Sequence, residues 1–236
     1  MNRVPNPRLK TLALEYLTKN YLDSSRAAEL HHSDLIYCLT KSCFDKTDPL
    51  PPTDDEVMLF SLGLGLQRVM SKEECSPITV DGIILSPDFT FRDGREDRLV
   101  ELKTTRLSTK KKNPKTGVVE YPEFSETWIE QIKGYCHATH STTYDLLVLH
   151  MLGGYSPPFP ELVGWRLEFT VEEVEEHWGY VLGRKGILVG ALANSALGTP
   201  TMPTPFKHCK DWECQRCRYK LRCDTIAAGP KLEGGE

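Results

Sequence analysis

The sequence predicts an α/β protein, and two observations carry that prediction. Apolar residues recur at helical spacing before about residue 72 and again after about residue 170, whereas short runs rich in Ile, Val, Leu and Phe occupy 78–102. The composition, 39% apolar and 26% charged over 236 residues, is that of a globular protein with a core. Collagen, coiled coil and wholesale disorder are therefore excluded.

Three helices are expected in the first part of the chain. Apolar residues over 9–17 recur at helical spacing, and a second helix over about 33–44 carries Cys38 one turn in. The Thr-Asp-Asp-Glu run at 53–56 is a capping-box pattern, so it starts a third helix that ends near Ser71.

The middle and the end of the chain alternate strands with helices. Short runs separated by turns predict an antiparallel meander of strands over 78–80, 83–85, 89–91 and 99–102. The following elements are a polar loop over 104–117, a helix over about 124–138, a strand over 144–151, an edge strand over 162–169 and a helix from 170 to before Gly198.

The eight cysteines call for a chemical explanation, because a chain of this length can fold by burial alone. Half of them crowd into the fifteen residues from Cys209 to Cys223, which favours a metal centre over a disulfide framework. The first thirty residues hold no apolar stretch typical of a secretion signal. We therefore expect a cytoplasmic protein with no membrane segment.

The sharpest chemical pattern joins Pro87-Asp88 to Glu101-Leu102-Lys103 across a turn. If the turn is centred between residues 94 and 95, paired residue numbers sum to 189 and Asp88 lies opposite Glu101. Alternation along the strand puts Glu101 and Lys103 on one face and Leu102 on the other. Two facing carboxylates suit Mg²⁺ or Mn²⁺, and Lys103 is placed to orient a water that attacks a phosphodiester.

Pairing alone leaves another interpretation equally open. Lys103 could simply bridge two exposed acids on a surface hairpin. Asp81 is the competing acid, but it lies too early to pair with Glu101 in this register, so Asp88 is preferred.

Several motifs resemble a known nuclease superfamily. Pro87-Asp88 with Glu101-Leu102-Lys103 is similar to the P-D…(D/E)-x-K signature of restriction-endonuclease-like nucleases. Gln131 and Tyr135 lie one helical turn apart and resemble the Q-x3-Y motif of RecB-type nucleases. The run Glu-Leu-Lys-Thr-Thr at 101–105 is typical of the same group.

The spacing of the cysteines makes this resemblance more specific, because it is similar to that of the CRISPR-associated RecB-like exonucleases. Cys214, Cys217 and Cys223, with Cys38 far upstream, resemble the iron–sulfur ligands of that family and imply a 4Fe–4S cluster. Spacing alone favours Cys209 over Cys38 as fourth ligand, because a short loop costs less entropy, and thiolates suit zinc as well. The cysteines expected to be free thiols are Cys43, Cys75, Cys136 and Cys209.

The resemblance also implies an architecture, namely a restriction-endonuclease-like αβββαβ core with a helical iron–sulfur lobe built from both chain ends. The expected parts are a helical lobe segment with the first core helix over 1–72, the nuclease core over 73–197, the cysteine cluster over 198–225 and a disordered tail over 226–236. Gln67 stands where the family usually has a histidine metal ligand, so its amide oxygen is a candidate ligand. His31 and His32 are expected to be exposed at a helix start.

The motifs together predict a metal-dependent DNA nuclease, an exonuclease acting on single-stranded DNA or DNA ends. The implied ligands of Mg²⁺ or Mn²⁺ are Asp88, Glu101, the Leu102 carbonyl and Gln67, while Lys103 assists the attacking water and Gln131 and Tyr135 hold the strand. A basic strip, Lys110, Lys111 and Lys112, would contact backbone phosphates or would equally well be a solvated loop. The net charge of −4 excludes a histone-like binder.

The implied setting is CRISPR spacer acquisition with integrase proteins, or phage or plasmid recombination, with a helicase as a further partner. No phosphate-binding loop of the G-x4-G-K-[ST] kind is present, so the chain is no helicase by itself. The alternative from a different class is a non-catalytic DNA-binding or adaptor protein with a cysteine-bound metal, either iron–sulfur or zinc.

Overall fold

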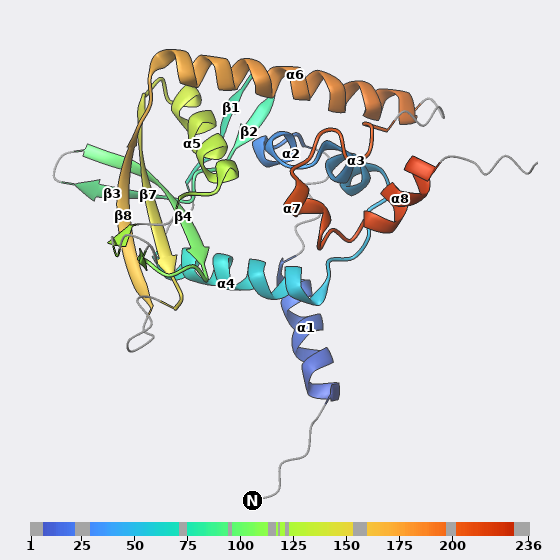
Figure 1. The fold of residues 1–236 in the computed structure, drawn as a ribbon, viewed down its shortest axis with the longest axis horizontal. Helices are drawn as coiled ribbons and strands as arrows, with labels where there is room; N and C mark the ends of the chain where they lie inside the picture. The colour runs from blue at the N-terminus through green and yellow to red at the C-terminus, as the bar shows by residue number, and fades with distance from the viewer. Residues whose placement is uncertain are drawn as a thin grey trace, which may run out of the picture. The chain divides into compact units, whose positions relative to one another are not determined.

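The computed structural model describes residues 7–21, 29–70, 75–93, 96–112, 117, 119–120, 123–152, 160–196 and 202–228. Contacts divide the chain into two compact units (Figure 1). One combines both chain ends, 1–62 and 180–236, and the other is 63–179. The division falls inside two long helices, α4 (Asp54–Met70) and α6 (Val171–Ala196), whereas the domain boundaries expected from the sequence were at 72 and 197.

The 63–179 unit is built on a four-stranded mixed sheet in the order β3-β4-β7-β8. Its strands are β3 (Phe89–Asp93), β4 (Glu96–Thr105), β7 (Thr143–His150) and β8 (Glu161–Glu168). Neighbouring strands are antiparallel except β4 and β7, which are parallel and therefore need the crossover that α5 (Glu126–Ala138) provides. The predicted α/β fold class is confirmed, and β8 is an edge strand as expected.

The predicted meander is wrong in one respect, because it is two separate hairpins. β1 (Ile78–Val80) pairs with β2 (Ile83–Leu85) in a small sheet of its own, and β3 pairs with β4. Pro87 lies between the hairpins and has no N–H to extend a strand ladder. The predicted register is confirmed, since Phe89 pairs with Val100 and Thr90 with Leu99.

The sheet has an apolar face that decides where the polar side chains of β4 point. Leu102 is buried in a cluster on that face, whose members are Phe89, Val100 and Leu102 with Leu66 and Met70 of α4 and Leu147 of β7. Because side chains alternate along a strand, burial of Leu102 directs Glu101 and Lys103 to the opposite face.

The segment after β4 is more ordered than the predicted polar loop. β5 (Lys111–Lys112) pairs with β6 (Val119–Glu120). Thr109, just before β5, is buried and donates a hydrogen bond to Glu161 at 2.8 Å.

The unit formed by the chain ends is helical (Figure 1). Its shorter helices are α1 (Pro7–Tyr21), α2 (His32–Ile36), α3 (Leu39–Thr47), α7 (Asp211–Cys214) and α8 (Lys220–Ala228). Phe44 of α3 stacks on Tyr219 with ring centroids 5.0 Å apart, and both pack with Cys223. Residues from the two ends of the chain thus share one core.

Three expectations for this unit are wrong. The predicted helix over 33–44 is broken at Cys38, which caps α3 and donates its N–H to the Glu213 carboxylate instead of to a helical carbonyl. His31 and His32 are buried rather than exposed. α8 continues to Ala228, so the predicted tail begins as helix, and residues 229–236 lie outside the described residues.

Candidate active site and cysteine centre

The predicted carboxylate pair lies at the start of the β3–β4 hairpin. Asp88 immediately precedes β3, and its Oδ2 accepts a hydrogen bond from the Leu102 N–H at 2.7 Å. Glu101, within β4, is 1% exposed. The backbone of one strand thus fixes the side chain of Asp88 beside Glu101.

A chain of hydrogen bonds holds Lys103 in this site. Its ammonium group pairs with Glu101 Oε1 and donates to Gln131 Oε1 at 2.7 Å. Gln131 Nε2 donates to the Tyr135 hydroxyl at 2.9 Å, and that hydroxyl donates to the Ser86 carbonyl at 2.8 Å. Gln131 therefore contacts the lysine directly, and Tyr135, one turn further along α5, supports Gln131.

Gln67 also reaches the hairpin. Its Nε2 donates to the backbone carbonyl of Asp88 at 3.0 Å. Gln67 thus lies beside Asp88, with its amide nitrogen bound to the backbone. Whether its amide oxygen serves as a metal ligand stays a prediction, as does the role of the Leu102 carbonyl.

Burial shapes the electrostatics of both acids. The pKa of Asp88 is raised by burial, against the lowering effects of the Leu102 N–H and the Lys103 charge. The pKa of Glu101 is raised to about 7, first by burial and further by Asp88, although Lys103 opposes the shift. One ammonium group, paired with Glu101, does not neutralise two desolvated carboxylates, so further positive charge would stabilise the site.

The donor set fits a divalent cation. The second oxygen of Glu101, Oε2, is buried and has no hydrogen-bond partner among the described residues. A buried carboxylate oxygen without a partner is costly unless a cation or water occupies the space beside it. Within the described ranges, no three His, Cys, Asp or Glu side chains converge on one point. A cation held by Asp88 and Glu101 would therefore keep several water or phosphate oxygens, as Mg²⁺ commonly does.

Sequence reasoning missed two groups of this site. The Ser86 carbonyl, which accepts the Tyr135 hydrogen bond, carries no side-chain signal. Tyr144 of β7 stacks on Tyr135 with centroids 5.2 Å apart, and its buried hydroxyl has no hydrogen-bond partner among the described residues. Its pKa is raised by burial and by the charges of Glu101 and Asp88, yet in sequence it is only one apolar residue of a buried strand.

The competing acid lies elsewhere in the unit. Asp81 occupies the β1–β2 turn at a φ of 50°. Its carboxylate accepts a hydrogen bond from the Trp178 indole at 2.9 Å. Of the basic strip, Lys110 is exposed and Lys111 and Lys112 form β5, whose side chains lie outside the described part of the chain.

The cysteine cluster gathers in the unit of the chain ends. The pKa of Cys223 is raised to about 11, first by burial and then by the neighbouring thiols Cys38, Cys217 and Cys214. The pKa of Cys209 is raised to about 12 by burial and by its contact with Cys214, whose sulfur lies 3.7 Å away. Although these thiols oppose one another's ionisation, no three cysteine side chains in the described part of the chain form a group that could hold a metal ion in this structure. Cys43, Cys75 and Cys136 make no contact with this cluster that the described residues record.

No protein-family model and no curated protein sequence matches the chain. Among solved structures, the chain is similar to SSO0001, at 13% identity over 92% of this chain and 96% of that one, with a TM-score of 0.48. It is also similar to an alkaline exonuclease, LHK-Exo, from Laribacter hongkongensis, at 14% identity over 78% of this chain and 97% of that one, with a TM-score of 0.44. Both scores are under 0.5, so function is argued below from the site's own geometry.

Among the helices formed by the described residues, none combines the length and the apolar character needed to cross a bilayer.

Proposed function

We propose that this chain is a divalent-metal-dependent deoxyribonuclease. The observation that carries the proposal is the buried pair Asp88 and Glu101 with the Lys103 ammonium bound between Glu101 and Gln131. Such a group of two acids and a lysine suits hydrolysis of a phosphodiester, where negative charge develops on phosphate oxygens.

Asp88 and Glu101 would hold the metal, with the Leu102 carbonyl and Gln67 as further candidates. Mg²⁺ or Mn²⁺, when bound, supplies Lewis acidity and makes water a stronger nucleophile at neutral pH. The chain's own residues would position the metal and the substrate. Burial of Glu101 strengthens the electrostatic interactions of the site, because few water molecules screen them.

Lys103 would orient the attacking water and offset the negative charge that develops on the phosphate. Its position is fixed by two acceptors, Glu101 and Gln131, so little reorganisation is required during the reaction. Tyr135 fixes Gln131 in turn, because its hydroxyl is anchored on the Ser86 carbonyl. The hydrogen-bond chain thus acts as a support for the lysine.

The finer parts of the proposal rest on the sequence motifs. We propose an exonuclease that acts on single-stranded DNA or DNA ends, in CRISPR spacer acquisition or in phage or plasmid recombination, with integrase proteins or a helicase as partners. Lys110, Lys111 and Lys112 would bind backbone phosphates. The cysteines would hold a structural metal centre, with a 4Fe–4S cluster favoured over zinc by the resemblance of Cys38, Cys214, Cys217 and Cys223.

The test is a cleavage assay with 5′- and 3′-labelled single-stranded DNA in Mn²⁺, in Mg²⁺ and in EDTA. Lys103→Ala should lower the cleavage rate at least about 100-fold while DNA affinity stays within about two-fold, since the lysine acts on charge that develops in the transition state. Lys133→Ala is the matched control, because Lys133 lies on the same helix as Gln131 but faces Phe169 and Glu173.

Two results would contradict the proposal. Cleavage that survives in Lys103→Ala at the wild-type rate would remove this site from the reaction. DNA retention without any EDTA-sensitive loss of label would instead identify a non-catalytic DNA-binding protein. The order in which the two labels are lost gives the polarity of the exonuclease.

A further inference from the structure

Two oxygen atoms of the candidate active site are buried without a hydrogen-bond partner among the described residues. They are Oε2 of Glu101 and the hydroxyl oxygen of Tyr144, in residues that are 1% and 5% exposed. A buried hydroxyl without a hydrogen bond costs free energy, and phenylalanine would fill the same space without that cost. The oxygen of Tyr144 therefore calls for a partner other than the side chains described around it.

Tyr144 lies on the same face of the sheet as Glu101. In the parallel pair of β4 and β7, Glu101 is opposite Leu146. Tyr144 precedes Leu146 by two positions, and side chains alternate along a strand, so all three residues share one face. Diagonal neighbours on adjacent strands stay within reach of each other when their side chains are long or aromatic. The two unpartnered oxygens therefore belong to one patch of the sheet.

The ring of Tyr144 is held against α5 on this face. It stacks on the ring of Tyr135, with centroids 5.2 Å apart and 20° between the ring planes. Tyr135 is 2% exposed, and its hydroxyl is fixed by Gln131 and by the Ser86 carbonyl. Because both rings are packed, the Tyr144 hydroxyl is confined to the region of the site.

Neighbouring donors of the site are bound elsewhere. Tyr135 has one hydroxyl hydrogen, which it donates to the Ser86 carbonyl, and Lys103 pairs with the other Glu101 oxygen, Oε1. An ionised carboxylate only accepts hydrogen bonds, whereas Tyr144 has a hydrogen to donate. The two unpartnered groups are therefore complementary. After burial, the charge of Glu101 is the next cause that raises the pKa of Tyr144, as expected for groups that lie close together.

We infer that Tyr144 is a positioning residue of the proposed active site, whose hydroxyl donates through one bound water to Oε2 of Glu101. A buried water commonly satisfies polar groups that do not meet directly. With Oε1 on Lys103 and Oε2 on this water, both oxygens of Glu101 are fixed, and Oε2 keeps a second lone pair for a cation. The inference rests on the proposed function, because it names the residue that orients a proposed metal-binding carboxylate.

The first test compares the Mn²⁺ affinity of wild type and Tyr144→Phe, which keeps the stacked ring and removes only the oxygen. Affinity is measured by isothermal titration calorimetry without DNA. It should fall about 10-fold, the lower end of the range for partners that orient a metal ligand. Tyr219→Phe is the matched control, because Tyr219 is also buried but its hydroxyl donates to Asp45 in the unit of the chain ends. That variant should lose stability and keep its Mn²⁺ affinity.

The second test asks whether Tyr144 acts through Glu101, by urea denaturation in EDTA at about pH 8, above the Glu101 pKa of about 7. In wild type, Tyr144→Phe should lower the urea midpoint, because it removes a hydrogen bond and leaves Oε2 without a partner. In Glu101→Met, which has no acceptor at this position, the hydroxyl is only a cost, so the same substitution should raise the midpoint. A merely structural role of Tyr144 would shift both midpoints alike.

The possible failures are distinguishable. In a wild-type protein that binds Mn²⁺ and cleaves DNA, unchanged Mn²⁺ affinity of Tyr144→Phe, or equal midpoint shifts in the two backgrounds, would overturn the inference alone. A crystal structure of metal-free wild type needs no variant: a water bonded to both oxygens supports the inference, and apolar packing around the Tyr144 hydroxyl contradicts it. Wild-type protein that neither binds Mn²⁺ nor cleaves DNA would overturn the proposed function, and the role of Tyr144 with it.

Discussion

Lys103 of β4 donates a hydrogen bond from its ammonium group to the Gln131 amide oxygen of α5, at 2.7 Å. This contact joins two residues 28 positions apart that the sequence connects only through a loose motif. The contact also fixes the orientation of the Gln131 amide. Because the amide oxygen is bound by the lysine, the amide nitrogen points to Tyr135 and donates to its hydroxyl at 2.9 Å.

Gln131→Met should therefore lower kcat by about 10- to 100-fold, the range typical of residues that orient a catalytic group through a hydrogen bond. Methionine keeps the length of the side chain but removes both hydrogen bonds. Cleavage rate and DNA affinity are measured separately on the same substrate. A lower kcat with unchanged affinity supports the positioning of Lys103, whereas weaker DNA binding at unchanged kcat would mean that Gln131 acts on the strand instead.

Stability of the metal-free protein should depend on the ionisation of Glu101. Its pKa in the folded state is raised from 4.5 to about 7, so the folded protein binds more protons than the unfolded chain between these values. The free energy of unfolding should therefore fall as pH rises through this window and level off above it, by a few kcal/mol at most.

Urea denaturation in EDTA, at a series of pH values, tests this for wild type and Glu101→Gln. The burial that raises the pKa of Asp88 is present in both proteins, so the difference between their two curves reports Glu101 together with its interaction with Asp88. That difference should change between pH 4.5 and 7, at the ordinary and shifted values of the Glu101 pKa. A flat difference across the window would show that burial does not hold the Glu101 proton.

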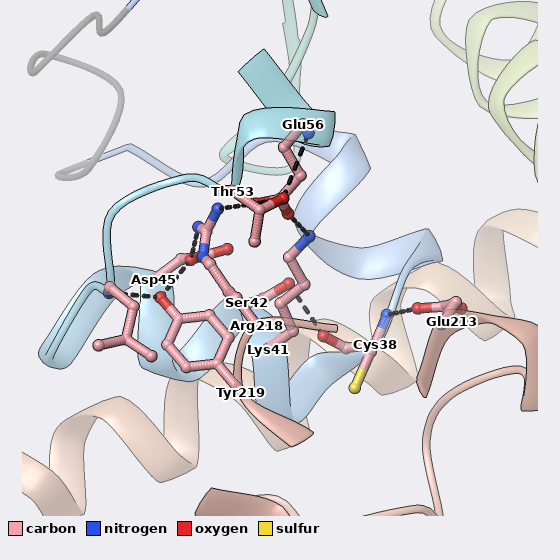
Figure 2. Close-up of polar contacts among 10 residues, drawn as sticks. Cys38, Lys41, Ser42, Asp45, Thr53, Glu56, Glu213, Arg218 and Tyr219 are labelled. Atoms are coloured by element: carbon pink, nitrogen blue, oxygen red, sulfur yellow. Dashed lines mark hydrogen bonds and ion pairs between the residues drawn. The ribbon is translucent and has the colours of Figure 1, made fainter. Parts of the chain in front are cut away.

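An ion-pair network should stabilise the unit of the chain ends (Figure 2). Arg218 pairs with Asp45 and, at 3.0 Å, with Glu56, and its side chain is 16% exposed. Arg218→Met should lower the free energy of unfolding by about 2 kcal/mol, between the values typical of exposed and of buried ion pairs, because it leaves two carboxylates without their shared partner.

The control for this change is Arg222→Met. Arg222 pairs with Asp48, whose side chain is 73% exposed, and its loss should cost under about 1 kcal/mol. A double-mutant cycle of Arg218→Met with Asp45→Asn measures the coupling directly. Additive effects of the two substitutions would argue against a cooperative network.

The basic strip should contribute salt-dependent DNA binding. Replacing Lys110, Lys111 and Lys112 by Gln should reduce the slope of log affinity against log salt by about 2 on single-stranded DNA, if each lysine contacts one phosphate. Replacement by Arg retains the charge and should leave the slope unchanged. Binding is measured by fluorescence anisotropy between 50 and about 300 mM salt. An equal slope for all three proteins would place the strip outside the DNA path.

Local sequence patterns were sufficient for most elements. The capping box at Thr53 forms as predicted, with Glu56 accepting the cap N–H at 2.9 Å, and the helix expected from residue 170 likewise begins directly after Thr170, whose N–H donates to Glu173 at 2.8 Å. Turn residues and strand alternation likewise predicted the register that brings Asp88 to Glu101. These features depend on neighbours a few residues apart, or on one hairpin, so they can be predicted from a single sequence.

Contacts between distant segments could not be predicted from the sequence in the same way. The break at Cys38 arises because Glu213, 175 positions away, takes its N–H, and no local pattern signals it. Burial of His31 and His32 and the unpartnered oxygen of Glu101 likewise depend on what packs around them.

The sequence by itself thus determined the α/β class and the register of the β3–β4 hairpin, whereas the roles of the acids and the lysine stay predictions. Only the tertiary structure decided how Lys103 is held by Gln131, that Cys38 and Cys209 lie on neighbouring segments, and that both chain ends share one core. The physical reason is that periodicity and capping act through the local backbone, whereas desolvation and long-range hydrogen bonds arise only when the chain folds.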